Sequence, residues 1–176
     1  ITPAYQALNA QQHREVEHWG RGAKHYVAKI RKIIALTGDA DILDYGCGKG
    51  SLSEELGFPV KEYDPGIPGK EGPAEPANLV VCCEVLEHVE PECLDAVLAD
   101  LRRCVKRIGF FGIPHNEAIH ALPDGRNAHV NVHSHGWWMT KLGQYFTVHS
   151  ATEVQAITAI KTNEMMLGSR TFFIVY

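Results

Sequence analysis

Glycines recur at every second position of one short segment. Residues 42–50 read Ile-Leu-Asp-Tyr-Gly-Cys-Gly-Lys-Gly, an apolar run that leads through Asp44 into glycines at 46, 48 and 50. Glycine lets a backbone turn sharply and approach a ligand closely, and a loop of this kind between a strand and a helix holds nucleotide-like cofactors. The dinucleotide-binding spacing G-x-G-x-x-G would require a glycine where Ser51 stands, which argues against a nicotinamide oxidoreductase.

A second acidic residue, Asp64, follows the glycine loop at a spacing that suits cofactor binding. Asp64 comes 18 positions after Gly46, at the end of the next expected strand. A carboxylate there can accept hydrogen bonds from both ribose hydroxyls of a nucleoside. The alternative is a turn aspartate, because Asp-Pro-Gly is a good turn sequence in its own right. Because Asp64 follows the glycine loop at this spacing, we favour its role in binding the ribose.

The third group of residues that could take part in chemistry is an acidic run after an expected buried strand. Residues 82–91 read Cys-Cys-Glu-Val-Leu-Glu-His-Val-Glu-Pro and fall at the carboxyl end of an apolar segment. Ligands of open α/β sheets bind at that edge. Glu84, Glu87 and His88 are therefore expected to face the same crevice as the glycine loop.

Taken together, these motifs resemble those of the class I S-adenosylmethionine (SAM)-dependent methyltransferases. The resemblance rests on D-x-G-x-G-x-G at 44–50, the acid at 64 and E-V-L-E-H-V-E-P at 84–91, and covers about residues 40–115. It implies methyl transfer from SAM, with S-adenosylhomocysteine as product, to an oxygen or nitrogen of a small-molecule or sugar-like acceptor. It implies that Asp44 reaches the ammonium group of the methionine part or a neighbouring backbone amide, and we favour the ammonium group. The implied cofactor-binding residues are Asp44, Gly46, Cys47, Gly48, Asp64 and Glu84.

A metal-assisted reaction is an alternative. The pattern E-x-x-E-H with a distant histidine resembles that of the Hen1-type RNA 3′-terminal 2′-O-methyltransferases. Two carboxylates and two imidazoles can hold a divalent cation, which would lower the pKa of a hydroxyl acceptor. The residues concerned are Glu84, Glu87, His88 and His129. The plainer interpretation, that Glu87 and His88 cap the next helix, is the one we favour.

Histidines are concentrated after the fifth expected strand. They lie at 115, 120, 129, 133 and 135. Because histidine titrates near neutrality, one of them can act as a general base. His129 is the first candidate and His115 the second, with Glu84 as a further catalytic candidate.

The elements that must position these residues alternate between strand and helix as far as residue 113. Such alternation predicts an α/β, Rossmann-like three-layer sandwich with a mostly parallel sheet. Terminal strands at about 146–150, 154–160 and 171–176 predict an antiparallel hairpin at its edge. The resemblance implies the sheet order 3-2-1-4-5-7-6, but four prolines in 64–77 predict that the third-strand region is shortened.

Length and composition indicate one domain over residues 1–176, with N-terminal helices over 1–37 and the Rossmann-like core over 38–176. Trp19 and Tyr26 are candidates for a lid over the cofactor. No apolar run reaches the ~20 residues that cross a bilayer, and the first residues lack a signal-peptide layout, so we expect a cytoplasmic protein without a membrane partner.

The net charge and the cysteines indicate which partners and which compartment to expect. A net charge of −4 does not indicate nucleic acid, although it does not exclude an RNA end. The five cysteines show no zinc-ligand or disulfide pattern, which is typical of a reducing compartment. A non-catalytic SAM-binding domain remains the other alternative, given the weak third-strand region.

Overall fold

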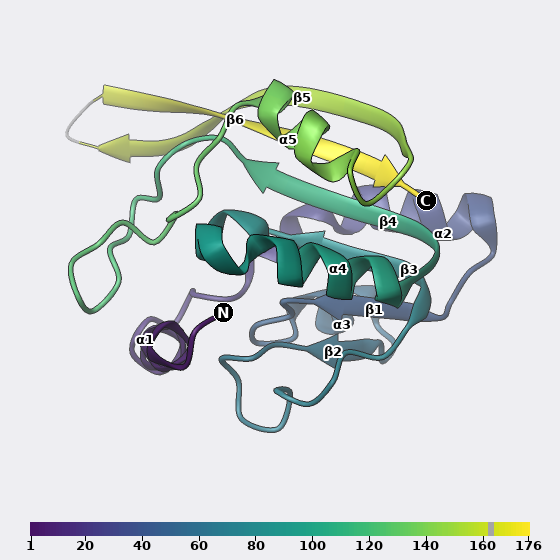
Figure 1. Cartoon of the computed structure of the whole chain (residues 1–176), viewed down its shortest axis with the longest axis horizontal. Coiled ribbons are helices and arrows are strands. Elements are labelled where there is room, and N and C mark those ends of the chain that lie inside the picture. Colours follow the sequence, from purple (N-terminus) through teal and green to yellow (C-terminus); the bar gives the residue numbers. More distant parts are fainter. Residues whose placement is uncertain (162–163) are drawn as a thin grey trace.

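The computed structural model describes the backbone of residues 1–161 and 164–176, and the side chains of residues 1–152 and 169–176. Helices and strands alternate along the chain (Figure 1). The α-helices are α1 (Pro3–Glu15), α2 (Val27–Thr37), α3 (Ser51–Leu56), α4 (Leu94–Cys104) and α5 (His135–Leu142). The strands are β1 (Ile42–Tyr45), β2 (Lys61–Tyr63), β3 (Ala77–Cys83), β4 (Val105–Pro114), β5 (Val148–Lys161) and β6 (Glu164–Val175). Three short 3-10 helices complete the fold: η1 (Gly22–Tyr26), η2 (Leu86–His88) and η3 (Pro91–Cys93).

The strands form one six-stranded sheet in the order β2-β1-β3-β4-β6-β5. The pairs among β2, β1, β3 and β4 are parallel, whereas β6 pairs antiparallel with both β4 and β5. This confirms the predicted mostly parallel sheet with an antiparallel C-terminal pair. The two segments expected as separate strands near 146–150 and 154–160 belong to the single strand β5.

Alternate side chains of the central strands enter two different cores, as the two-residue period of a strand requires. On β3, Val80 packs in the core beneath α4 and α5, which contains Leu98 and Trp138. Its neighbour Val81 packs in the core beneath η1, α2 and α3, which contains Ile30. Helices therefore cover both faces of the sheet, which is the predicted three-layer arrangement.

The region of the third strand is replaced by turns. Residues 64–76, all of which the structure describes, contain no strand or helix. Prolines at 65, 68, 73 and 76 remove backbone donors and disfavour the regular conformations, so the chain returns to the sheet only at Ala77. The shortened sheet is thus a consequence of the proline spacing.

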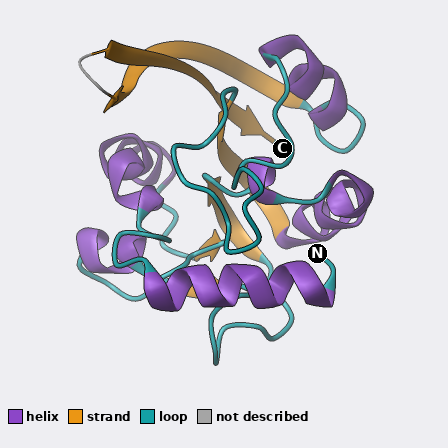
Figure 2. Cartoon of the chain, turned by 90° about the vertical axis from the view of Figure 1, so that its left-hand side faces the viewer, coloured by secondary structure: helices purple, strands orange, loops and turns teal. Residues whose placement is uncertain are grey.

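Helix α1 lies across the edge of the sheet where the parallel strands end (Figure 2). Thr2 caps the helix and also binds the Glu90 carboxylate through its backbone N–H (2.7 Å) and its hydroxyl (2.8 Å). Tyr5 of α1 packs against Leu122 and Ala128 of the long loop after β4. These contacts hold the N-terminal helix over the carboxyl ends of the strands. None of the helices formed by the described residues has the length and apolar character needed to cross a bilayer.

Candidate functional site

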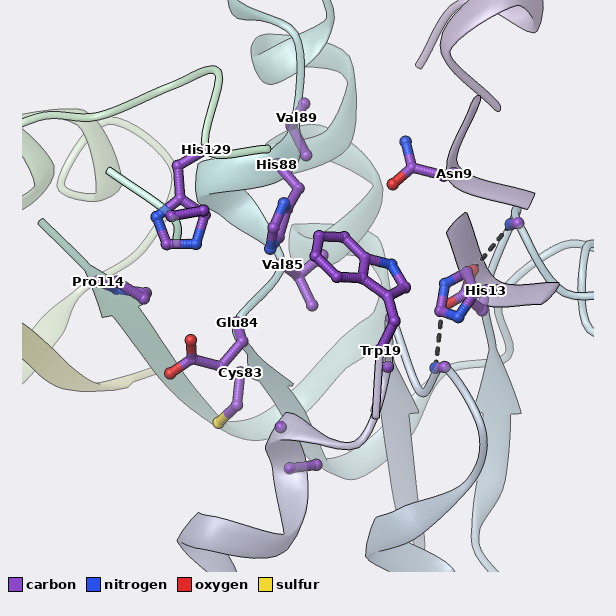
Figure 3. A pocket seen from close by; sticks show the side chains of 18 of the residues that line it. Asn9, His13, Trp19, Cys83, Glu84, Val85, His88, Val89, Pro114 and His129 are labelled. Atoms are coloured by element: carbon purple, nitrogen blue, oxygen red, sulfur yellow. Dashed lines mark hydrogen bonds between the residues drawn. The ribbon is translucent and has the colours of Figure 1, made fainter. Parts of the chain in front are cut away.

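A cavity of about 350 Å³ lies where α1, the strand ends and the loop after β4 meet. Two ends of this cavity differ in their lining. We call the first the glycine-loop end, formed by Gly46, Gly48, Asp64 and Gly66, and the second the histidine end, formed by Glu84, His88, His129 and Arg170. Figure 3 shows Trp19 between His13 and Asn9 on one side and His88, Glu84 and His129 on the other.

Gly46 turns the chain where β1 ends. Its φ of 79° lies in the left-handed region, and its N–H donates to the Tyr63 carbonyl at 2.7 Å. A Cβ at this position would lie 2.3 Å from a methyl carbon of Val85. Only glycine satisfies both the backbone conformation and the available space, so the loop keeps bare backbone next to the cavity.

Asp64 holds the glycine loop to the turn that follows β2. One carboxylate oxygen accepts from the Gly48 N–H and the other from the Gly66 N–H, each at 2.8 Å. The residue is 8% exposed and lines the cavity. Since a carboxylate has about four lone-pair sites, two bonds leave Asp64 able to accept from further hydroxyl groups.

Asp44 lies beneath the cavity and is not among its lining residues. The side chain is 1% exposed, and its Oδ2 has no hydrogen-bond partner among the described residues. Burial, followed by the nearby charges of Glu62 and Asp64, raises the pKa of Asp44 to about 8. Of the six predicted cofactor-binding residues, the other five line the cavity, and Asp44 is the buried carboxylate behind them.

Glu84 begins the histidine end with an unusual backbone. Its φ is 59°, the only positive value at a non-glycine residue in the described part of the chain. The carboxylate accepts from the Tyr26 hydroxyl and from Arg170 Nη1 (3.0 Å), and burial raises the pKa of Glu84. Strained backbone of this kind is concentrated at functional sites. Tyr26, expected as part of a lid, instead lies below the cavity and holds Glu84 in place.

Glu87, His88 and His129 form a compact cluster whose ligand atoms all lie within 4.8 Å of one another. The Nε2 atoms of His88 and His129 lie 3.7 and 3.9 Å from Glu87 Oε1. Glu87 is fully buried, and neither carboxylate oxygen has a hydrogen-bond partner among the described residues. Burial raises the pKa of Glu87 well above its usual range. Burial lowers the pKa of His88 to about 3, so this imidazole is neutral near pH 7.

The two histidines of this cluster are oriented by backbone carbonyls. His88 Nδ1 lies 2.8 Å from the Ala128 carbonyl and His129 Nδ1 lies 2.5 Å from the Asn116 carbonyl. Because a carbonyl can only accept, each Nδ1 carries the proton and each Nε2 presents a lone pair toward Glu87. Three of the four residues proposed for a metal thus come together. Glu84 does not join them, because its carboxylate is engaged by Tyr26 and Arg170.

His115, the second candidate for a general base, is placed differently. Its backbone N–H donates to the Ser169 carbonyl at 2.8 Å, and its ring lies 6.3 Å from that of His135. It does not belong to the cavity lining. The base candidates that line the cavity are therefore His129 and Glu84.

Several lining residues were not expected from the sequence. Tyr5, Asn9 and His13 of α1 all line the cavity. Their four-residue spacing puts them on one helix face, a signal that could have been found. Arg170 comes from β6 and is brought to Glu84 by strand pairing, for which the sequence carries no local signal.

The comparisons with known proteins agree with this geometry. A family model described as a methyltransferase domain matches residues 14–154. The chain belongs to the class I SAM-dependent methyltransferases. No curated protein sequence matches this methyltransferase significantly.

Solved methyltransferases share its fold. The N1-methyltransferase for 1,6-didemethyltoxoflavin from Burkholderia thailandensis, solved with that compound and S-adenosylhomocysteine, has a TM-score of 0.64 and 17% identity, covering 98% of this chain and 91% of that one. The N-methyltransferase NodS from Bradyrhizobium japonicum, with S-adenosylhomocysteine, has a TM-score of 0.60 and 15% identity, covering 98% and 99%. The methyltransferase domain of bacterial CtHen1 has a TM-score of 0.55 and 14% identity, covering 86% and 98%. At these levels of identity, the three structures show that the fold is shared.

Proposed function

We propose that this enzyme transfers the methyl group of SAM to an oxygen or nitrogen of a small-molecule or sugar-like acceptor. Bound SAM supplies an activated methyl group on a sulfonium. The observation that carries the proposal is that the two ends of one cavity differ in their lining. The glycine-loop end contains Gly48, Asp64 and Gly66, whereas the histidine end contains the titratable side chains of Glu84 and His129. One end suits a nucleoside, and the other suits a nucleophile that must lose a proton.

The residues present fit the cofactor. Asp64 retains acceptor capacity beside the bare backbone of Gly48, which suits the two hydroxyls of a ribose. Asp44 is a buried carboxylate without a partner at Oδ2, and the positive charge of a methionine ammonium group would favour its ionised form. This chain therefore provides hydrogen-bond acceptors where a cationic nucleoside needs them.

The histidine end provides a proton acceptor. His129 donates Nδ1–H to the Asn116 carbonyl, and burial lowers its pKa, so that Nε2 carries a lone pair near pH 7. A general base is needed when the acceptor loses its proton during attack on the methyl group. Alignment of the acceptor and exclusion of water by the cavity wall supply the rest of the catalysis. Two of the solved structures that share the fold are N-methyltransferases, which supports a nitrogen acceptor.

The domain layout and the compartment belong to the same proposal. We treat residues 1–176 as one catalytic unit in which 1–37 cover the cavity and 38–176 form the core. The lining of the cavity by Tyr5, His13 and Trp19 supports this division. All five cysteines are free thiols, which supports a reducing compartment such as the cytoplasm.

Calorimetric titration with S-adenosylhomocysteine and, separately, with NADH tests the proposal. We expect S-adenosylhomocysteine to bind in the micromolar range and NADH not to bind. Binding of NADH alone would contradict the proposal. Binding of S-adenosylhomocysteine with no methyl transfer from SAM to any acceptor in a small-molecule panel would favour a non-catalytic SAM-binding domain.

A metal-assisted reaction is a second candidate, favoured by the Glu87, His88 and His129 cluster. Both imidazoles present Nε2 lone pairs, and the backbone carbonyls that fix their orientation are of the kind that orients metal-binding histidines. A divalent cation would supply a Lewis acid next to the acceptor. An RNA end would then become a second acceptor class, although the net charge of −4 offers it little attraction.

Thermal unfolding with Mg²⁺, Mn²⁺ or Zn²⁺ tests this candidate. A specific site stabilises the wild-type protein by an amount that grows with the logarithm of the cation concentration, about 2.7 kcal/mol at 100 times the dissociation constant, and so raises its melting temperature. The rise should be absent in His129→Ala. An equal rise of the melting temperature in both proteins would indicate non-specific binding and would contradict a metal-assisted reaction.

A further inference from the structure

A short segment between α1 and η1 crosses the glycine loop. We call residues 16–21 the strap. Its residues Trp19 and Gly20 line the cavity, as does His13 from the last turns of the preceding helix. The Trp19 ring lies edge-on to His13 and to His88, with ring centres 6.4 and 5.2 Å apart (Figure 3). The strap therefore supplies part of the cavity wall between the glycine-loop end and the histidine end.

Lys49 of the glycine loop binds the strap through three hydrogen bonds. Its backbone N–H donates to the Gly20 carbonyl at 2.9 Å. Its Nζ donates to the carbonyls of Val16 and Glu17, each at 2.8 Å. Bonds from an ammonium group are stronger than those between neutral groups. One side chain thus joins the loop that would hold the cofactor to the segment that covers it.

The two segments also touch along their backbones. A Cβ on Gly48 would lie 2.4 Å from the Gly20 carbonyl oxygen and 2.6 Å from its Cα. A Cβ on Gly20 would lie 2.4 Å from Cε1 of His13. The absence of side chains at both glycines is therefore required for the strap to lie this close to the loop. The exposed ion pair between Arg21 and Glu54 of α3 (3.1 Å) adds a further tie.

We propose that Lys49 is a positioning residue: it fastens the strap to the glycine loop and thereby retains SAM and S-adenosylhomocysteine in the cavity. Gly48 and Gly20 both line the cavity and lie against each other, so their contact forms part of the cavity wall at the glycine-loop end. Movement of the strap away from the loop would open this part of the wall and speed the release of a bound ligand. This inference rests on the proposed cofactor site, and adds a role for a residue that does not line the cavity.

The test is the release rate of tritiated S-adenosylhomocysteine into an excess of unlabelled ligand. In Lys49→Met, which keeps the aliphatic stem but loses both Nζ bonds, we expect release to be about 10-fold faster than in the wild type. Lys49→Arg keeps a donor to the carbonyls and should restore most of the retention. Lys32→Met, at an exposed lysine of α2, is the matched control and should release at the wild-type rate.

A second variant makes the test independent of Lys49. Gly20→Ala places a Cβ against His13 and should also speed release. The urea midpoint of each variant, measured in parallel, distinguishes release from unfolding. A wild-type release rate in Lys49→Met would overturn the role of Lys49, and a wild-type rate in Gly20→Ala would overturn the role of the strap in retention. Failure of the wild-type protein to bind S-adenosylhomocysteine would instead contradict the proposed function.

Discussion

The glycine-loop end and the histidine end of the cavity are built in opposite ways. At the glycine-loop end, the contacts run between backbone N–H groups and one carboxylate, and all the residues fall within 46–66. At the histidine end, side chains from η2, the loop after β4 and β6 meet, and the residues span positions 84 to 170. The first end depends on a local backbone path, and the second depends on how distant segments pack.

Under the proposed function, this difference separates cofactor binding from the chemical step. At the glycine-loop end, positive φ values and close contacts at Gly46 and Gly48 leave little room for substitution. Four predictions test the separation, beginning with the largest expected effect.

Removing the Asp64 carboxylate should weaken S-adenosylhomocysteine binding by about 1,000-fold, equivalent to about 4 kcal/mol. Asp64→Ala removes the acceptor for the ribose and also frees the N–H groups of Gly48 and Gly66. Calorimetry measures the change, with Asp95→Ala, an exposed acid paired with Lys141, as control. A loss of affinity of less than 10-fold would contradict the proposal that Asp64 binds the cofactor.

Alanine at Gly46 should destabilise the protein by about 3 kcal/mol more than alanine at Gly57. The two glycines have nearly the same φ, 79° and 80°, so the backbone strain of a side chain is matched. A Cβ at Gly46 meets Val85 at 2.3 Å, whereas a Cβ at Gly57 meets nothing within 4 Å. Urea unfolding measures both. Equal losses would show that the loop is not tightly packed against the segment after β3.

The contrast between the two ends also explains what the sequence could predict. Glycine spacing and the acid at 64 report a local backbone path, and the structure places Gly46, Gly48 and Asp64 together at one end of the cavity. The strand–helix alternation likewise predicts the sheet, and the prolines predict its missing strand.

The histidine end was only partly predictable. The motif at 84–88 indicates an acidic site, but which carboxylate faces which partner depends on Arg170, 86 positions away from Glu84. His115 and His129 look alike in the sequence, and only the path of the long loop decides that His129 lines the cavity. The sequence predicts N-terminal helices over 1–37, but the cavity-facing residues Tyr5, Asn9 and His13 were not identified, although their four-residue spacing is visible in the sequence.

The buried carboxylate of Asp44 should make stability depend on pH. Its pKa is raised from 3.8 to about 8 in the folded protein, so the folded state holds a proton that the unfolded chain releases above pH 4. Its contribution therefore falls as the pH rises from 4 toward 8. We expect the free energy of unfolding to drop by up to about 2 kcal/mol between pH 6 and 8, and by less in Asp44→Asn. Identical pH profiles of the two proteins would show that Asp44 is ionised in the fold.

Substitution at the histidine end should leave cofactor binding nearly unchanged. His129→Ala removes Nε2 from the cluster with Glu87 but touches nothing at the glycine-loop end. We expect its calorimetric affinity for S-adenosylhomocysteine to stay within about 2-fold of the wild type, less than 0.5 kcal/mol. A loss of affinity as large as that in Asp64→Ala would contradict the division of the cavity into two separate ends.

The central claim is that residues 46–66 hold the nucleoside, and a crystal structure of the enzyme with S-adenosylhomocysteine tests it most directly. We expect the ribose hydroxyls within hydrogen-bonding distance of Asp64 and the sulfur facing the histidine end. A nucleoside bound elsewhere, or a glycine-loop end filled by side chains in the complex, would contradict the account.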